Sequence, residues 1–358
     1  MKRLIPAILA MTTCLVQLTG CTQKEDVITS KSDAFVVVTD YFKNDGTKDV
    51  ADAIQKVIDN NPNRTIYFPD GTYILSHSIL TPADPTKAVH LVLGNFAILR
   101  AMVGWEEGNA IVKLGGKDPY NSIRICGSNY GIEGGIFDGT GVADGISVDS
   151  GRESRIDQVS IKNTRIGIHV KTGANNGSSD CDIVDVNIVG NDKQNSIGVL
   201  LEGHDNTLTN MRIASVNTGV WIKTGGNSLK NIHPLYIFAD TQDYESSCGF
   251  YIEKDGNNWF DYCYSDQFCT AFKLGRNVNA NLTDCFAWWY SGKVSSQTAI
   301  SCEGPLQAIV YGMHLGFSKD CPEVAVLRAE KGGDGSLQNL SINRTDLSSA
   351  DVSASYTK

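Results

Sequence analysis

One short pattern recurs along most of the chain and constrains its fold more than any other feature of the sequence. Each copy begins with a small residue and then alternates apolar and polar side chains, as a β-strand with one buried face does. Seven copies are present, at residues 145–149, 167–171, 198–202, 219–223, 249–253, 271–275 and 299–303. Their starts are separated by 22, 31, 21, 30, 22 and 28 residues, with no helical period between them. This spacing excludes a doubly wound α/β sheet and predicts an all-β solenoid with periodic loop insertions.

Two rows of side chains are predicted to point away from the interior of this solenoid. Strand side chains alternate, so the second and fourth positions of each copy face inward and the third and fifth face outward. The third positions are Ser147, His169, Leu200, Trp221, Tyr251, Lys273 and Ser301, and the fifth positions are Asp149, Lys171, Glu202, Lys223, Glu253, Gly275 and Glu303. Coils stack about 4.8 Å apart, so the members of each row are expected to be neighbours.

A second family of short strands lies between the copies and carries a polar residue at a corresponding place. These residues are Gln158, Asp185, Asn210, Asn231, Asp261, Asp284 and Asn339. A row of carboxylates would suit a metal ion, but the mixture of Asn, Gln and Asp favours a stacked ladder that satisfies backbone groups at a turn. No metal site is therefore predicted.

Cysteine placement argues against a disulfide framework, although the chain has ten cysteines. Cys14 and Cys21 belong to the apolar start of the chain. The other eight form no CxxC pair and have no histidine at zinc spacing. Cys302 takes the place that Val148 and Ile222 take in other copies, so most of these cysteines are interpreted as small buried hydrophobic residues. One disulfide remains open in an exported protein.

The first residues predict export and a lipid anchor. Lys2 and Arg3 precede an apolar run too short to span a bilayer, which is typical of a secretory signal at residues 1–20. The segment that ends at Cys21 resembles the bacterial lipobox, which implies a lipid on Cys21 as the first mature residue and a location in the outer membrane, on the cell surface or the periplasmic face. Residues 21–39 are then a tether and a first strand, and the lipid is expected to be the only part of the protein that enters the membrane.

A formal charge of −9 with no basic run excludes nucleic-acid binding.

Residues 40–79 are predicted to cap the solenoid at its N-terminal end. Residues 47–60 carry apolar side chains at helical spacing, and two short strands are expected at 65–69 and 72–76. The sequence 44–49 (NDGTKD), the AIQ at 53–55 and the YFPDGTY at 67–73 resemble the opening of the pectate-lyase-like β-helix superfamily. The resemblance implies a right-handed parallel β-helix as one domain over residues 40–358, with a polysaccharide or oligosaccharide partner. Hydrolases, lyases, epimerases and phage tailspikes share this opening, so it names no reaction.

The outward rows supply the candidate binding residues. Trp221 above Tyr251 is interpreted as an exposed platform for sugar rings, with His169, Lys171 and Lys223 beside it to bind hydroxyls or carboxylates. The alternative is a solvated face whose charges pair with one another. Long loops at 174–180, 238–247 and 291–298 are expected to form walls beside this face.

Glu202 is the predicted central carboxylate. Lysines on both sides are expected to lower its pKa, which suits a base that activates water. Asp149 and Glu253, each two coils away, are candidate proton donors, and His204 is a further one. The intact motifs of polygalacturonases, alginate epimerases and pectate lyases are absent from the sequence.

These features predict an extracytoplasmic polysaccharide-degrading enzyme, with glycoside hydrolysis favoured over β-elimination. The alternative is a non-catalytic glycan-binding or structural β-helix. No cofactor is expected for hydrolysis, whereas a lyase would call for Ca²⁺ to neutralise a uronate.

Overall fold

A computed structural model describes residues 35–118, 131–172, 178–238, 243–254, 256–290, 297–318, 321 and 324–344. The predicted signal peptide, the lipobox with Cys21 and the tether as far as residue 34 lie outside the described residues, as do Cys126 and loop residues 291–296. Within the described part, no helix is long and apolar enough to cross a membrane.

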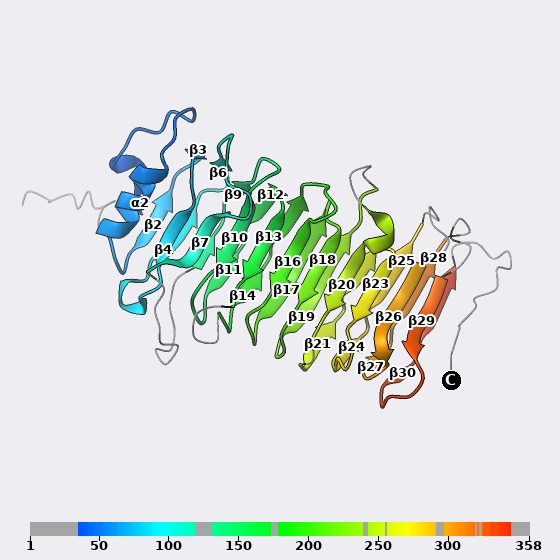
Figure 1. Ribbon diagram of the computed structural model, residues 1–358. Helices are drawn as coiled ribbons and strands as arrows, with labels where there is room; N and C mark the ends of the chain where they lie inside the picture. The colour runs from blue at the N-terminus through cyan, green and yellow to red at the C-terminus, as the bar shows by residue number, and fades with distance from the viewer. Residues whose placement is uncertain are drawn as a thin grey trace, which may run out of the picture.

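Parallel strands make up most of the described chain, and they form two long sheets (Figure 1). Sheet B has ten strands: β4 (Ile79–Pro82), β7 (Ala110–Lys117), β10 (Asp144–Val148), β13 (Ile166–Val170), β16 (Ile197–Leu201), β18 (Thr218–Ile222), β20 (Cys248–Ile252), β23 (Thr270–Leu274), β26 (Gln297–Pro305) and β29 (Val324–Glu330).

Sheet A has 21 strands, most of them short. They are β1 (Val36–Val37), β2 (Thr65–Phe68), β3 (Gly71–Leu75), β5 (His90–Leu93), β6 (Ala97–Ala101), β8 (Gly131–Glu133), β9 (Ile136–Asp138), β11 (Arg155–Asp157), β12 (Ser160–Thr164), β14 (Asp182–Val184), β15 (Asn187–Gly190), β17 (Thr207–Ala214), β19 (Ser228–Leu235), β21 (Asn258–Asp261), β22 (Tyr264–Asp266), β24 (Ala280–Thr283), β25 (Phe286–Trp289), β27 (Ile309–Tyr311), β28 (His314–Phe317), β30 (Ser336–Gln338) and β31 (Ser341–Arg344).

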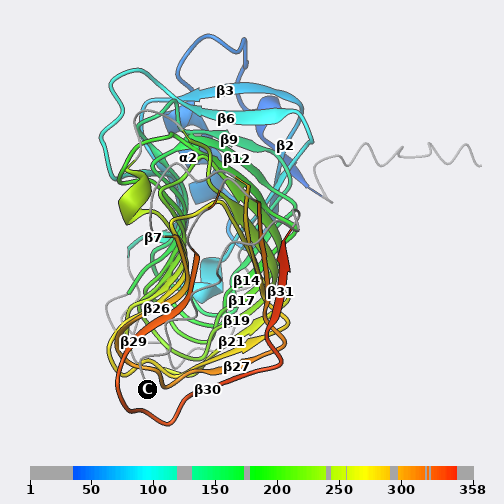
Figure 2. The ribbon, with the colours of Figure 1, turned by 90° about the vertical axis from the view of Figure 1, so that its right-hand side faces the viewer.

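The order of strands along the chain shows how each coil is built. From β10 the chain passes through β11 and β12 of sheet A and returns to sheet B as β13, which pairs in parallel with β10. The same sequence of sheets repeats in later coils, and the end-on view shows the coils superimposed around one core (Figure 2). The predicted all-β parallel β-helix is confirmed, and all seven copies of the repeat are strands of sheet B.

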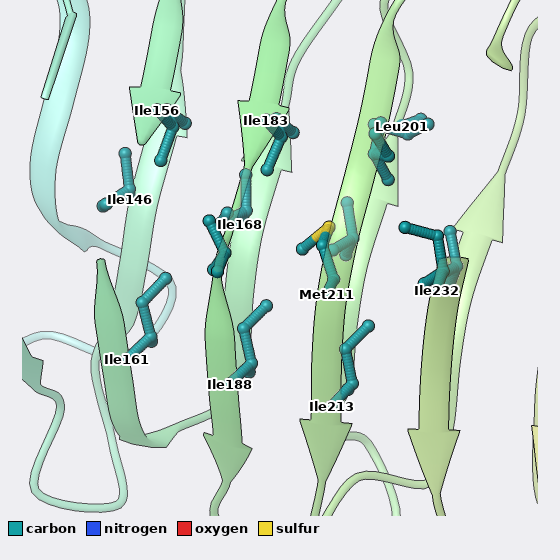
Figure 3. Packing of buried hydrophobic residues seen from close by; sticks show 14 of the residues in the cluster. Ile146, Ile156, Ile161, Ile168, Ile183, Ile188, Leu201, Met211, Ile213 and Ile232 are labelled. Carbon is teal, nitrogen blue, oxygen red and sulfur yellow. The ribbon is translucent and has the colours of Figure 1, made fainter. Parts of the chain in front are cut away.

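The core consists of apolar side chains that stack on their equivalents in the next coil. Ile146 and Ile168 of sheet B point toward Ile161 and Ile188 of sheet A, and all four are buried (Figure 3). The small residue that begins each copy is required by this packing. A Cβ on Gly167 would lie 2.6 Å from the carbonyl oxygen of Gly198 and 2.7 Å from Ile188 Cγ2. In the five copies that begin with glycine, the missing Cβ therefore lets the chain segments approach closely at the start of the strand.

The N-terminal cap contains α2 (Ala51–Asn60), the one α-helix of the described chain. Ile54, Val57 and Ile58 bury its apolar face in the core at the end of the solenoid (Figure 1). The helix starts at Ala51, later than the predicted residue 47, because Asp45 and Asp49 hold the preceding turn. Asp49 accepts hydrogen bonds from the Ala51 N–H and from Ser76.

The AIQ motif has a structural role in this cap. The Gln55 amide donates to the Leu80 carbonyl at 3.0 Å, and its oxygen accepts from the Leu80 N–H at 2.9 Å. This pair of bonds joins α2 to β4, which is the first strand of sheet B. The motif therefore fixes the cap against the first coil.

The predicted polar ladder lies on sheet A, in the bend between β14 and β15 and at the equivalent points within β17 and β19. Asn231 donates to Asn210 at 2.9 Å, and Asn210 donates to Asp185 at 3.0 Å. All three residues have positive φ angles of 53–55°, which Asn and Asp tolerate better than most residues. The prediction was wrong at one coil, because Tyr262 and not Asp261 takes this left-handed position.

A second ladder, absent from the sequence predictions, lies inside the coils where sheet B ends. Asn206, Asn227 and Asn258 are fully buried. The Asn206 amide donates to Asn227 and the Asn227 amide donates to Asn258, each at 2.9 Å. Each side chain also accepts from a backbone N–H of the preceding coil. Since buried backbone groups need partners, this ladder replaces strand pairing at a corner.

The described cysteines are free thiols. Cys181, Cys248, Cys263, Cys269, Cys285 and Cys321 are buried and Cys302 is half-buried. Cys302 pairs in register with Leu274, as the interpretation of these residues as small hydrophobic side chains requires. Of the adjacent aromatic residues Trp288, Trp289 and Tyr290, Trp289 is fully buried, as the strand alternation predicts.

Candidate functional site

The outer face of sheet B carries the predicted third-position row in the predicted register. Trp221 pairs with Leu200 on one side and with Tyr251 on the other. The row continues beyond the seven repeats at both ends, since Lys113 pairs with Ser147 and Arg328 pairs with Ser301. Alternation of side chains along each strand is therefore sufficient to predict which residues share this face.

An apolar patch on this face was not predicted. Ile166, Ile197 and Leu200 form a small cluster separate from the core, and Trp221 packs against it. Strict alternation places Ile166 and Ile197 inside, in line with Ile168 and Val199. They lie outside because the glycine that follows each of them faces the interior, which gives the strand two consecutive inward positions. Close packing of the sheets at these glycines thus adds an outward position to each strand.

Trp221 and Tyr251 stack on each other with their ring centroids 5.4 Å apart and an interplanar angle of 29°. The prediction that both are exposed was wrong, because each is half-buried. The Trp221 Nε1–H donates to Glu253 Oε2 at 2.8 Å. Lys223 Nζ lies 4.6 Å from the Trp221 ring centroid, and Lys273 Nζ lies 4.3 Å from that of Tyr251. The rings are therefore held in fixed orientations by cations and a carboxylate.

Glu202 lies between two donors in the middle of this face. Its Oε2 is 3.0 Å from His169 Nε2 and its Oε1 is 3.0 Å from Lys223 Nζ. Lys171, predicted as its second cation, instead pairs with Asp149 at 3.2 Å. His169 takes that place because its ring reaches across to the next coil.

Electrostatics favour an ionised Glu202, as predicted. Partial burial acts to raise the pKa of the Glu202 carboxyl, but the hydrogen bonds from His169 and Lys223 outweigh it, so this pKa lies below its ordinary value. Burial lowers the pKa of His169, although the nearby Glu202 opposes the shift. The imidazole is therefore neutral near pH 7, with its Nε2–H donated to the carboxylate.

The candidate proton donors occupy different surroundings. Asp149 accepts from the Ser147 hydroxyl and from Lys171, and Glu253 accepts from Trp221. Both lie two coils from Glu202, a separation of about 10 Å between strands. His204 is exposed on the turn after β16, where its backbone pairs with Ser179. The histidine that contacts Glu202 is His169, and not His204, because the chain has already turned away from the face at residue 203.

A pocket of about 350 Å³ lies at the N-terminal end of the same face. It is lined by Leu80 and Lys113 of sheet B and by a loop that includes Trp105, Glu106 and Asn109. Lys113 donates to the Asn109 side chain at 2.6 Å. The sequence did not reveal this pocket, because residues 102–109 carry no repeat pattern.

The structure describes the predicted wall loops in part. Residues 178–180 belong to the turn that leaves sheet B, and residues 243–247 include the short helix η3 (Tyr244–Ser246) before β20. Residues 297 and 298 are the first residues of β26 and not a loop. Within the described residues, no group of three or more His, Cys, Asp or Glu side chains is arranged to hold a metal ion.

The sequence matches a known family over most of the region that forms the cap and the first coils. Residues 35–243, more than half of the chain, match the family described as "Rhamnogalacturonase A/epimerase, pectate lyase-like". The chain belongs to this family. Membership in this rhamnogalacturonase A/epimerase family agrees with the resemblance of the NDGTKD, AIQ and YFPDGTY segments to the pectate-lyase-like superfamily, and it makes the β-helix a fold of carbohydrate-active proteins.

Three solved structures show the same fold in proteins of different activity. An endo-xylogalacturonan hydrolase from Aspergillus tubingensis has a TM-score of 0.56 at 13% identity, covering 84% of this chain and 91% of that chain. An alginate lyase from Paenibacillus sp. has a TM-score of 0.54 at 14% identity, and the match covers 81% of this chain and 97% of that chain. The tailspike protein of E. coli bacteriophage HK620 has a TM-score of 0.62 at 12% identity. That match covers 88% of this chain and 64% of the tailspike, so the chain spans less than two thirds of that protein. No curated protein matches the sequence.

Proposed function

We propose that this member of the rhamnogalacturonase A/epimerase family binds a polysaccharide across the outer face of sheet B and hydrolyses its glycosidic bonds. The observation that carries the proposal is the position of Glu202. This carboxylate has a lowered pKa and lies on the same face as the stacked rings of Trp221 and Tyr251. An ionised carboxylate next to aromatic rings is what a glycosidase needs to hold a sugar and activate water.

Binding would use both the rings and the polar groups around them. The exposed parts of Trp221 and Tyr251 offer apolar surface for a sugar ring. Lys171, Lys223 and His169 supply donors for hydroxyl or carboxylate groups of the polymer. The pocket at Lys113 extends the same face by two coils and can take a further sugar residue.

In the proposed reaction Glu202 acts as the general base. It removes a proton from a water molecule that attacks the anomeric carbon, while a second carboxyl group protonates the leaving oxygen. Asp149 and Glu253 are the candidates for that second group, each about two coils or 10 Å away, near the upper end of the separation in inverting glycosidases. The hydrogen bonds from His169 and Lys223 keep the base charged and fix its orientation.

A specific observation favours β-elimination as the second candidate. Lys171 and Lys223 lie on the same face within hydrogen-bonding distance of carboxylates. A uronate in the substrate could replace one of those carboxylates as the partner of a lysine, which would help to neutralise it for removal of the neighbouring proton. The non-catalytic alternative is favoured by the same contacts, since each central carboxylate already has a donor.

Incubation of the protein with plant, algal and host polysaccharides separates these functions. Hydrolysis produces new reducing ends without an unsaturated product, and elimination produces both. Retention on a polymer with no new ends would show binding without cleavage and would overturn the proposed reaction. Glu202→Gln should lower any cleavage at least ~10²-fold while the polymer is still bound.

We also propose that Cys21 carries a lipid and anchors the protein in the outer membrane. The support is the signal-like start of the chain and its lipobox-like ending at Cys21. A lipid on Cys21 would tether the β-helix at its capped end, because residue 35 leads into β1, which pairs with β2 of the cap.

A further inference from the structure

A column of rings on the outer face of sheet A lies outside the site described above. His233 of β19, Tyr264 of β22 and Phe286 of β25 occupy the same position on consecutive coils. The rings of His233 and Tyr264 stack with centroids 4.1 Å apart at 15°, and those of Tyr264 and Phe286 are 4.7 Å apart at 48°. His314 of β28 is the next residue in this position and is exposed.

A pocket of about 380 Å³ opens at the end of this column. The rings of Tyr264 and Phe286 line it together with Tyr262, Asp284, His314, Leu315 and Ser341. The pocket thus lies where the stack would continue, and it offers a ring surface, a carboxylate, an imidazole and a hydroxyl to a bound molecule.

Tyr262 is an independent sign that this pocket has a use. It has a φ of 53° at the ladder position that Asn231 and Asp284 fill on the neighbouring coils. A bulky residue in the left-handed region costs free energy that Asn or Asp largely avoids. Its side chain gains little from packing, since it is 64% exposed. The turn requires the left-handed conformation but does not require a tyrosine, and a residue held in a strained conformation is a recognised mark of functional positions. Here the tyrosine places a phenol ring at the rim of the pocket.

The chemistry of the lining selects the class of ligand. Aromatic rings beside hydroxyl, carboxylate and imidazole groups suit a sugar residue, whose ring has apolar faces and a polar edge. Among the residues that the structure describes, the lining contains Asp284 and no lysine or arginine, so a uronate would meet a carboxylate without a described cation to balance it. The face of sheet B differs, because it carries Lys171, Lys223 and Lys273.

We propose that this pocket on sheet A is a second carbohydrate-binding site, without catalytic function, that takes a neutral sugar residue against Tyr264 and Phe286. Sheet A at β31 and sheet B at β29 lie on opposite sides of the coil (Figure 2). The two sites therefore cannot contact the same sugar residue. A protein with both can hold one part of a glycan while another part crosses sheet B.

Affinity electrophoresis with neutral polysaccharides tests the proposal. The full chain, purified in detergent, is run in gels containing xyloglucan, galactomannan, arabinan, arabinogalactan, starch or β-1,3-glucan, with polygalacturonate as the acidic comparison. All proteins carry Glu202→Gln so that no polymer is cut. At least one neutral polymer is expected to slow migration, and polygalacturonate is expected to do so independently of this pocket.

Three variants assign the binding to the pocket. Phe286→Ala removes a ring of the column, His314→Ala removes an exposed side chain of the rim, and Ser341→Trp fills the pocket from an exposed position. Phe286→Ala and Ser341→Trp should each weaken binding of the neutral polymer by about tenfold, and His314→Ala by less. Because His314 and Ser341 are exposed, their variants remain informative if Phe286→Ala fails to fold.

Two controls decide between explanations. Phe96→Ala removes a ring that is 70% exposed near the capped end and should leave binding unchanged. Trp221→Ala disrupts only the sheet B site, so binding of the neutral polymer should survive it. The proposal is overturned if no neutral polymer binds, or if Trp221→Ala abolishes binding and Phe286→Ala does not. It is also overturned if the pocket variants convert a dimer to a monomer with no change in sugar binding, since the rings would then be a protein contact.

Discussion

Replacement of Glu202 by glutamine separates a catalytic role from a structural one, because glutamine keeps the size of the side chain and removes its charge. The carboxylate accepts two hydrogen bonds of 3.0 Å, from His169 and Lys223, and its side chain is 28% exposed. Hydrogen bonds to charged groups contribute roughly 1.5–3 kcal/mol when well buried, and an amide can retain part of each bond. We expect a loss of about 1 kcal/mol in the free energy of unfolding, or about 1–2 °C in Tm for a chain of this length.

Turnover should fall far more than stability. A general base contributes roughly 10²–10⁴-fold, so Glu202→Gln should lower kcat at least ~10²-fold with KM little changed. Reducing-end release from the best polymer of the panel measures kcat, and thermal unfolding by circular dichroism measures Tm. Glu330→Gln is the matched control, since Glu330 pairs with Arg276 outside the central part of the face.

The pH dependence of turnover and of Tm provides a second comparison between Glu202→Gln and Glu330→Gln. Because the pKa of Glu202 is lowered, the base stays charged as the pH falls below about 4.3, the ordinary value for glutamate, and activity should be lost only near the lowered pKa. The stabilising effect of ionised Glu202 is present above the unfolded-state pKa and is lost through the same acidic range. A variant that keeps its turnover and loses only thermal stability would refute the assignment and leave Glu202 as part of an ion-pair ladder.

Three further outcomes are expected. Trp221→Ala should weaken polysaccharide binding at sheet B by about 1–2 kcal/mol in calorimetry, and because the ring is half-buried it should also lower Tm; unchanged affinity would show that sugars do not use this ring. Asn227→Ala should destabilise the protein by about 2–3 kcal/mol in urea unfolding, since it removes the acceptor of the buried Asn206 backbone N–H and one of the two acceptors of the Asn206 amide, whereas Asn210→Ala on the exposed ladder should cost less than about 1 kcal/mol; equal effects would contradict the importance of burial. Cys21→Ala should move the protein from the membrane to the soluble fraction, and continued membrane association would disprove the lipid anchor.

The sequence was sufficient to predict the fold and the register of sheet B because both depend on short-range alternation. A strand that begins with glycine and alternates apolar and polar residues leaves one choice for the face of His169, Trp221 and Tyr251. The same alternation was misleading for Ile166 and Ile197. Their outward direction depends on how closely two sheets approach at a glycine, which is a property of the packed solenoid.

The details of the candidate site depended on side-chain geometry that a linear pattern does not contain. Lys171 and His169 both lie one coil from Glu202, and the sequence favoured the lysine because it shares the fifth-position row with Glu202. In the structure Lys171 is bound by Asp149, which leaves Glu202 to His169. The strained Tyr262 was missed because Asp261 next to it fits the ladder pattern better.

The reactivity of the buried thiols can report how often neighbouring coils separate. Thiolates, not thiols, react with disulfides and alkylating reagents, and burial raises the pKa of Cys269 and Cys302 to about 11. Cys263 and Cys285 lie on neighbouring coils, and burial together with the hydrogen bond between them raises the pKa of Cys285. While the coils stay closed, the full burial of Cys263 and Cys285 shields their sulfurs from reagents. A transient separation of two coils would expose both at once, so the rate at which a reagent captures them reports how often that part of the solenoid opens.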